Sequence, residues 1–208
     1  MRKHTIKFVL MLLCLFGNPF TLNIVNPNEA VAEVTKSQVS RPIKRLLQSI
    51  RLNKDEIALK SFDGQKQGKL LFGESWEGYP DEERQRFVTA LHAFFTLVAF
   101  PNIRKDFEHL ETIIYGEPTQ AEEGIYKLRA TIVVLHALKK EEIPVDFLVS
   151  GANKEWHILD FWIAPKGEDS PSFLTRLKSQ QLEPLLQKDG WSGLLTAMER
   201  RVEELKKR

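Results

Sequence analysis

The chain has 208 residues, of which 28% are charged and 42% are hydrophobic, and its formal net charge is +2. This length fits a single domain that buries roughly two thirds of the surface of its unfolded chain. Outside residues 1–32 there are 27 basic and 27 acidic residues. A net charge of zero argues against a protein that binds nucleic acid through a basic face.

The N-terminus has the pattern of a secretory signal peptide. Arg2 and Lys3 precede an apolar stretch from Phe8 to Phe16, and Ala30-Val31-Ala32 fits a signal-peptidase site. The alternative is an uncleaved anchor, but Gly17-Asn18-Pro19 interrupts the apolar stretch before it reaches the ~20 residues that a membrane span needs. We therefore expect a signal peptide over residues 1–32 and a single domain over residues 33–208.

The one cysteine, Cys14, lies inside the predicted signal peptide. The mature chain then has no cysteine, which excludes structural disulfides, thiol catalysis and cysteine metal sites. Export without cysteine favours a bacterial periplasm as the location.

The first part of the mature chain has helical spacing. Amphipathic helices are predicted from Ala32 to about Leu52, from Asp55, and from Lys69 to Trp76. A fourth helix starts at Pro80-Asp81-Glu82-Glu83, where proline and three acids occupy the first turn. Pro101 is expected to end this helix, with a short turn over residues 103–107.

The fourth helix has an unusually wide apolar arc. Two neighbouring stripes form it: Phe87, Leu91, Phe94 and Val98 in one, and Val88, Phe95 and Ala99 in the other. One interpretation is a central helix packed between a sheet and outer helices; the other is that part of the arc lines a cavity.

Four strands follow, over residues 110–115, 125–134, 143–149 and 156–163. The second places Leu128, Ala130, Ile132 and Val134 on one face, and the third places Val145, Phe147 and Val149 on one face. The strand over residues 156–163 is apolar on both faces, so both should be covered. After a loop at Pro165–Pro171, two helices are predicted, separated at Asp189-Gly190.

The sequence shows no recognisable catalytic or cofactor-binding motif, and we expect no cofactor, no metal and no catalytic residue. The five histidines lack metal-ligand spacing, and Gly64–Leu70 has the wrong glycine spacing for a phosphate loop. Asp160 stands in the most apolar strand, with His157 predicted on the opposite face. It fits either a carboxylate of raised pKa in an apolar pocket or, as we favour, an ion pair with Arg129 or Lys127 across the sheet.

Four stretches together resemble the toluene-tolerance auxiliary family, the MlaC-like periplasmic phospholipid carriers that serve an ABC transporter. They are Phe62–Phe87, Glu142–Phe147, Trp156–Asp160 and Leu185–Leu194. The chain departs from the family pattern at Tyr79, where the family usually has threonine, and at the longer segment Ala164–Pro171. The longer segment puts the pocket mouth and the partner surface in question.

The resemblance implies an α+β fold, with a curved antiparallel sheet of about four strands wrapped by helices around an apolar cavity for acyl chains. It implies a soluble monomeric carrier, without enzyme activity, that shuttles phospholipid between an inner-membrane ABC transporter complex and an outer-membrane lipoprotein complex. This role maintains outer-membrane lipid asymmetry and solvent tolerance. The residues expected to line the lipid pocket are Phe94, Leu97, Val98, Leu128, Ile132, Val145, Phe147, Val149, Phe173 and Leu177.

Three alternatives stay open from the sequence. One is a small periplasmic enzyme that acts on an apolar substrate with Asp160 as acid or base. Another is a carrier of a hopanoid-type lipid in place of a phospholipid. The third is a cell-envelope adaptor that binds only protein and would release no stoichiometric lipid on extraction.

Overall fold

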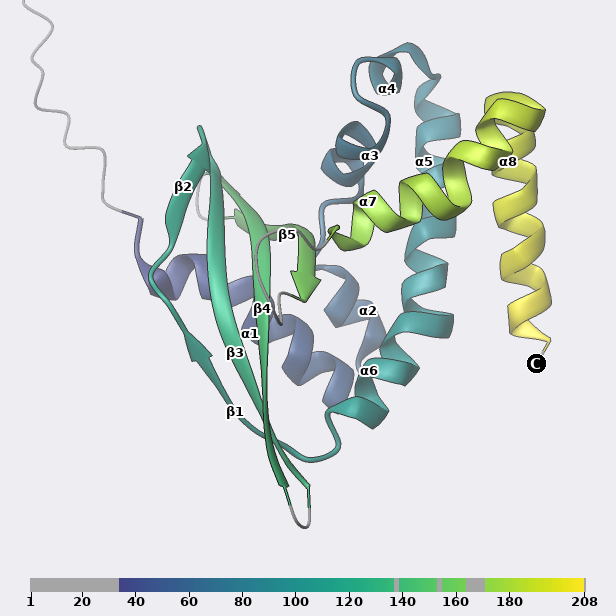
Figure 1. Ribbon diagram of the computed structural model, residues 1–208. Helices are drawn as coiled ribbons and strands as arrows, with labels where there is room; N and C mark the ends of the chain where they lie inside the picture. The colour runs from purple at the N-terminus through teal and green to yellow at the C-terminus, as the bar shows by residue number, and fades with distance from the viewer. Residues whose placement is uncertain (1–33, 137–138, 153–154, 164–170, 208) are drawn as a thin grey trace, which may run out of the picture. The chain divides into compact units, whose positions relative to one another are not determined.

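The computed structural model describes residues 34–136, 139–152, 155–163 and 171–207. Within these ranges one antiparallel sheet packs against a set of helices (Figure 1). The predicted signal peptide and most of the predicted loop Ala164–Pro171 lie outside the described residues.

Most helices follow the apolar spacing of the sequence, but the single helix predicted from Lys69 to Trp76 is wrong: α3 begins at Gly64 and ends at Phe72, and Gly73, with φ 59°, separates it from α4. Helix α1 begins at a capping box, in which the Thr35 hydroxyl accepts a hydrogen bond from the backbone N–H of Gln38 and the Gln38 side chain accepts one from the Thr35 N–H. The helical segments in chain order are α1 (Lys36–Arg51), α2 (Asp55–Leu59), α3 (Gly64–Phe72), α4 (Ser75–Gly78), α5 (Asp81–Phe94), η1 (Phe95–Ala99), α6 (Phe100–Asp106), α7 (Phe173–Leu177), η2 (Lys178–Leu182) and α8 (Glu183–Lys206).

Pro101 does not end the helix that begins at Asp81, as the sequence predicted. The helix passes through the π-helical turn η1 and resumes as α6, with Pro101 in the first turn of the new segment. Pro101 has no N–H to donate in a helix, and the π-helical turn just before it already interrupts the regular hydrogen-bond ladder, so the helical run can continue through this position. Helix α8 contains a break at Gly190, whose φ of 67° lies in the left-handed region, as the Asp189-Gly190 pair predicted.

The sheet has five strands, one more than predicted. The additional strand is β2, whose side chains are all exposed and therefore carry no apolar alternation. It pairs with the start of β3, and the remaining order is β1-β3-β4-β5 with every pair antiparallel. The strands are β1 (Leu110–Tyr115), β2 (Thr119–Glu122), β3 (Ile125–His136), β4 (Lys139–Ala152) and β5 (Glu155–Ile163).

The two central strands present the apolar face that their alternation predicted. Leu128 pairs with Phe147 and Ala130 with Val145, and all four side chains are buried. Helix α1 contacts β3, β4 and β5, and burial of this face accounts for much of the core.

A β-bulge in β5 changes which side chains share a face. Ile158 pairs with Val149 while Asp160 pairs with Leu148, so Leu159 is the additional residue. The carbonyl of Leu159 accepts a hydrogen bond of 3.0 Å from the buried Gln67 amide of α3. His157 and Asp160 therefore lie on the same face of the sheet, because their partners Ser150 and Leu148 are two residues apart on β4. The prediction of opposite faces was wrong, since it assumed regular alternation.

One end of the helical region is packed with aromatic rings from α3, α4, α5 and α8. The Trp76 indole is 1% exposed and lies 5.6 Å from the Phe87 ring and 6.1 Å from the Trp191 ring, measured between ring centroids. The Tyr79 ring stacks on Trp191 at 3.8 Å. Gly68 allows this packing, because a Cβ at that position would lie 2.3 Å from the Trp76 ring. We call this group of rings the aromatic cluster.

Candidate functional site

The helical run Asp81–Asp106 is apolar but poorly covered by protein. By length and composition it is the one helix of the described residues that qualifies as a membrane span. Only 33% of the most apolar stretch of this helix is buried, whereas the core helix of a globular protein is mostly buried. The uncovered apolar side chains border two hollows, so they need no membrane to explain them.

The first hollow lies between the sheet and the helices α1, η1 and α6, and we call it the sheet cavity. Its volume is about 390 Å³. The strands contribute alternate residues of their apolar face, and α1 contributes Leu46 and Leu47. Its lining is Leu46, Leu47, Phe62, Phe95, Ala99, Phe100, Ile103, Asp106, Phe107, Ile132, Val134, Glu141, Ile143, Val145, Phe147, Phe161, Ile163 and Phe173.

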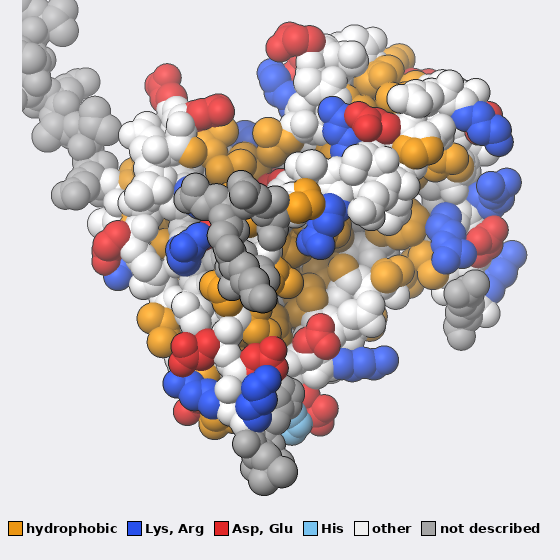
Figure 2. All heavy atoms as spheres, viewed as in Figure 1, with side chains coloured by type: hydrophobic (Ala, Val, Ile, Leu, Met, Phe, Trp, Pro, Cys, Tyr) orange, Lys and Arg blue, Asp and Glu red, His pale blue; other side chains and the backbone are white. Residues whose placement is uncertain are grey.

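The second hollow lies among α5, η1, α7, η2 and α8, and we call it the helix cavity. Its volume is about 520 Å³. Figure 2 shows hydrophobic side chains gathered in the recess between the sheet and the helices and again below α7. The lining of the helix cavity is Leu91, Phe94, Phe95, Val98, Ala99, Phe173, Leu177, Gln181, Leu182, Leu185, Ala197, Met198, Arg201 and Leu205.

Three residues, Phe95, Ala99 and Phe173, border both cavities. The Phe95 and Phe173 rings lie 5.8 Å apart, and Phe173 stacks on Phe161 of β5 at 5.1 Å with an interplanar angle of 8°. We call these three residues the partition. Because a pair of rings and a methyl group form it, the two cavities are neighbours across the thickness of one layer of side chains.

Polar groups occur in each lining in small number. Asp106 and Glu141 belong to the sheet cavity, and Gln181 and Arg201 belong to the helix cavity. A predominantly apolar lining with a few polar groups is typical of sites for small apolar ligands. Both cavities therefore suit an amphiphile, with an apolar part inside and a polar end close to water.

Seven of the ten residues predicted for the pocket border at least one cavity. Ile132, Val145 and Phe147 line the sheet cavity, Phe94, Val98 and Leu177 line the helix cavity, and Phe173 lines both. The structure places Leu97, Leu128 and Val149 in neither lining. Leu128 and Val149 are 0% exposed and belong to the packed part of the sheet, and Leu97 packs against the core.

Sequence reasoning missed the contributions of α1, α6 and α8. Leu46 and Leu47 were assigned to an ordinary amphipathic helix, and Ile103 and Phe107 to a turn, yet all four line the sheet cavity. Met198 belongs to the regular stripe of the last helix and lines the helix cavity. The stripe spacing identified the apolar faces of these helices, but it gave no signal to distinguish a cavity from a packed interface.

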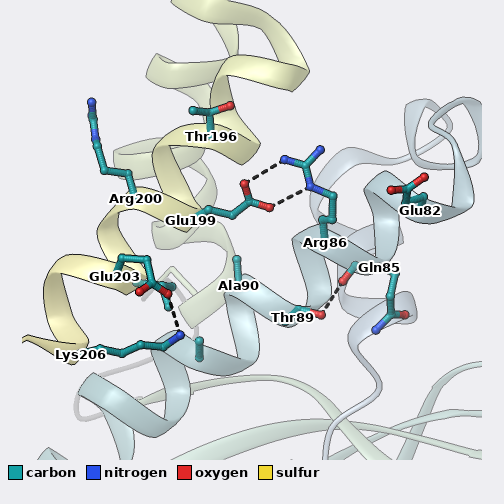
Figure 3. A pocket seen from close by; sticks show the side chains of 12 residues that line it. Glu82, Gln85, Arg86, Thr89, Ala90, Thr196, Glu199, Arg200, Glu203 and Lys206 are labelled. Atoms are coloured by element: carbon teal, nitrogen blue, oxygen red, sulfur yellow. Dashed lines mark hydrogen bonds and ion pairs between the residues drawn. The ribbon is translucent and has the colours of Figure 1, made fainter.

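A third hollow is the groove between α5 and α8, with a volume of about 800 Å³ (Figure 3). Six of its twelve lining residues are charged: Arg86 donates two hydrogen bonds to Glu199, at 2.8 and 2.9 Å, and Lys206 pairs with Glu203 at 2.7 Å. Ion pairs that face water contribute little stability. This groove is larger than either cavity but more open to water, so it would cover an acyl chain less completely.

Asp160 does not form the ion pair that we expected from the sequence. Arg129 instead donates hydrogen bonds of 2.8 and 2.7 Å to the buried Asp146, its cross-strand partner on β4, and Lys127 lies 3.7 Å from the same carboxylate. The hydrogen bonds from Arg129 hold the pKa of Asp146 below its ordinary value. The register decides the pairing, because Asp160 lies opposite Leu148.

Asp160 instead connects β5 to α7. One carboxylate oxygen accepts hydrogen bonds from the backbone N–H of Leu174, at 3.0 Å, and of Phe161, at 2.8 Å. Burial raises the pKa of Asp160, while hydrogen bonds from Ser172 and these two amides act in the opposite direction. Asp160 appears in the lining of neither cavity. No group of three or more metal-ligand side chains occurs within the described ranges.

Comparisons with known proteins agree with this architecture. A solved phospholipid-binding protein from Ralstonia solanacearum, in complex with a phospholipid, is 15% identical and has a TM-score of 0.64, covering 83% of this chain and 98% of its own. A second structure, named Rd1NTF2_05, is 12% identical and covers 61% of this chain and 96% of its own, with a TM-score of only 0.37. A search of the curated proteins gave no match. The family model described as MlaC protein matches residues 28–200, and the chain therefore belongs to the MlaC family.

Proposed function

We propose that this protein is a periplasmic phospholipid carrier, which receives its cargo from one membrane complex and delivers it to another. The observation that carries the proposal is the apolar sheet cavity, which the helix Asp81–Asp106 borders. Family membership and the fold shared with the phospholipid-binding protein of Ralstonia solanacearum support it.

The energetics explain why such a carrier needs an apolar hollow. A phospholipid with two chains has about thirty methylenes, and each costs about 0.8 kcal/mol to expose to water, so about 20 kcal/mol opposes the crossing of an aqueous compartment. A cavity lined by leucine, isoleucine and phenylalanine removes that cost for the methylenes that it encloses. Because the membrane interior and the cavity are both apolar, loading changes the free energy little. Partner complexes can then set the direction of transfer.

The proposal includes partners and a location. The protein acts as a monomer between an inner-membrane ABC transporter complex and an outer-membrane lipoprotein complex, in support of outer-membrane lipid asymmetry. The segment of residues 1–32, with the pattern of a signal peptide, directs it to the periplasm. The proposed transfer involves no covalent step. Asp160, the acid or base of the enzyme alternative, accepts hydrogen bonds from two backbone amides and so has a structural role.

Replacement of a lining residue by a charged one tests the proposal. Phe147 is 5% exposed on the apolar face of β4 and lines the sheet cavity. In Phe147→Glu a carboxylate would face the acyl chains, and its desolvation makes lipid binding unfavourable. We expect the wild-type protein, purified from the periplasm of a bacterial host, to release stoichiometric phospholipid on extraction, and Phe147→Glu to release almost none by mass spectrometry.

Thr131→Glu is the matched control, because Thr131 precedes Ile132 on β3 and points to the opposite face of the sheet. This variant should keep its lipid. A folded Phe147→Glu variant that retains the wild-type amount of lipid would contradict the assignment. A wild-type protein that releases no lipid would favour the adaptor, and a wild-type protein that releases a hopanoid would change the class of cargo.

A further inference from the structure

The helix cavity is built differently from the sheet cavity. Among the described residues, helices alone line it, and none of these lining residues belongs to a strand. Two π-helical turns form part of its walls, with Phe95 and Val98 from η1 and Gln181 and Leu182 from η2. A π-helical turn is rare, because it disturbs regular helical hydrogen bonding, and it is frequently found at functional sites. Its volume of about 520 Å³ exceeds the 390 Å³ of the sheet cavity.

The lining of the helix cavity includes apolar side chains that have too few protein neighbours. Val98 is 38% exposed, and Phe94, Leu177, Leu185 and Leu205 are half-buried. These residues come from α5, η1, α7 and α8, so the exposed apolar surface surrounds one hollow. An apolar ligand that filled the hollow would remove this surface from water, at roughly 25 cal/mol for each Å².

The rim of the helix cavity offers one cationic group. The Arg201 side chain is 46% exposed, and within the described part of the chain it pairs with Glu204, one turn further along α8, at 3.1 Å. A guanidinium has five N–H donors in a planar fork, so a single hydrogen bond to Glu204 leaves donors for an oxyanion. Gln181 adds an amide to the same lining. The sheet cavity has acidic groups instead, Asp106 and Glu141.

We propose that the helix cavity is a second acyl-binding site, which takes one fatty acyl chain and holds the anionic end of that chain, a carboxylate or a phosphate, at Arg201. The partition of Phe95, Ala99 and Phe173 separates it from the sheet cavity, so the two sites bind independently. This inference rests on the proposed function, because it extends lipid binding from one cavity to both. The predominantly apolar lining of both hollows supports an acyl chain as the ligand of each.

Two substitutions fill one cavity each and thereby separate the sites. Ala197 of α8 lines only the helix cavity, and Val145 of β4 lines only the sheet cavity. The purified protein is titrated with palmitate and, separately, its phospholipid content is measured by native mass spectrometry. We expect Ala197→Phe to abolish palmitate binding in the helix cavity and keep the phospholipid. Val145→Phe should lose the phospholipid and keep a palmitate site.

The end group is tested at Arg201. Arg201→Gln should weaken binding of palmitate about tenfold, the loss expected for one charge-assisted interaction, and leave the affinity for hexadecanol unchanged. Palmitoyl lysophosphatidylglycerol distinguishes the source of the anion: a site for fatty acids prefers palmitate, and a site for phospholipid prefers the phosphate. Arg201 is partly exposed, so its replacement leaves the fold intact.

The outcomes separate this inference from the proposed function. If Ala197→Phe and Arg201→Gln both bind palmitate as the wild type does, the second site is wrong while the carrier assignment stands. If each filled variant loses phospholipid and palmitate together, the cavities form one site and the inference also fails. If the wild type contains no phospholipid but binds palmitate at Arg201, the proposed function fails and the acyl site stands. Ala197→Leu repeats the test with a smaller side chain, should Ala197→Phe unfold.

Discussion

The two ends of the run α5–η1–α6 carry similar apolar side chains in different surroundings. Near its start, Phe87 and Val88 are 0% and 6% exposed, and the aromatic cluster fills the space around Phe87. Further along, Phe94 and Val98 border the helix cavity. The difference comes from the opposing elements: Trp76 and Trp191 face the first end, whereas Ala197 and Leu205 face the second. The same helical stripe is therefore structural core at one end and a binding surface at the other.

The largest effect is expected from Trp76→Ala at the packed end. The indole is buried against Gly68, Phe87 and Trp191, and its removal leaves a cavity that the neighbouring rings cannot close. We expect the free energy of unfolding to fall by about 3–5 kcal/mol, measured by urea denaturation. Phospholipid content of the folded fraction should not change.

Phe94→Ala is the matched control at the hollow end of the same helix. Phe94 is half-buried and already borders a cavity, so its removal enlarges an existing hollow and loses fewer contacts. We expect a loss below about 2 kcal/mol, because burial and cavity creation both contribute less there. Equal losses for Trp76→Ala and Phe94→Ala would show that the two ends are packed alike, contrary to the comparison.

A smaller effect is expected at Asp160, which lies on β5 and binds the start of α7 next to the partition. Its carboxylate accepts the N–H groups of Phe161 and Leu174, and Leu174 follows Phe173 of the partition. Asp160→Ala should lower the free energy of unfolding by about 1–3 kcal/mol, since two buried amides lose their acceptor. Amide hydrogen exchange should be faster at Leu174 and unchanged in the aromatic cluster.

Asp160→Asn keeps an acceptor oxygen in the same place and should cost less than Asp160→Ala. It also separates carrier from enzyme, because a carrier with asparagine at this position should keep its lipid. Faster exchange around Trp76 in place of Leu174 would show that Asp160 stabilises the packed end. Loss of a catalytic turnover in Asp160→Asn would revive the enzyme alternative.

The sequence predicted the elements well because local patterns determine them. Alternation in the central strands identified the face that contains Leu128 and Phe147, and the family resemblance predicted the α+β fold around a cavity. The bulge at Leu159 was not predictable, since alternation assumes a regular ladder, and for that reason the predicted face of His157 was wrong. The predicted partner of Asp160 was wrong because Arg129 pairs with its direct cross-strand neighbour Asp146. Strand β2 was missed because its exposed side chains show no apolar period.

The site was predicted less completely than the fold, for a physical reason. An apolar side chain lowers the free energy equally well against another side chain or against an acyl chain, so its spacing carries no information about the hollow. Leu128 and Val149 were included and proved to be packed core, whereas Leu46 and Phe107 were left out and line the sheet cavity. Whether such a residue is packed core or lines the sheet cavity depends on where α1 and α6 pack against the sheet, and the local sequence pattern does not determine that position.

The smallest effect is expected at His92, which stands on α5 between the packed and the hollow ends. Its ring stacks near Phe95 at 6.2 Å, and its buried Nε2 has no hydrogen-bond partner among the described residues. Burial lowers the pKa of His92 below its ordinary value of 6.5, because the imidazolium is poorly solvated there.

The folded protein therefore binds a proton at His92 less readily than the unfolded chain does. The contribution of neutral His92 to stability is complete above about pH 6.5 and is lost as the pH falls toward the lowered pKa. His92→Phe removes this titration and an unpartnered buried nitrogen, and we expect it to be more stable than the wild type by up to about 1 kcal/mol at neutral pH. Its free energy of unfolding, measured by urea denaturation between about pH 7 and pH 5.5, should decrease less than that of the wild type. If the two proteins lose stability in parallel as the pH falls, His92 is solvated in the folded state. The packed end of the helix would then stop before His92.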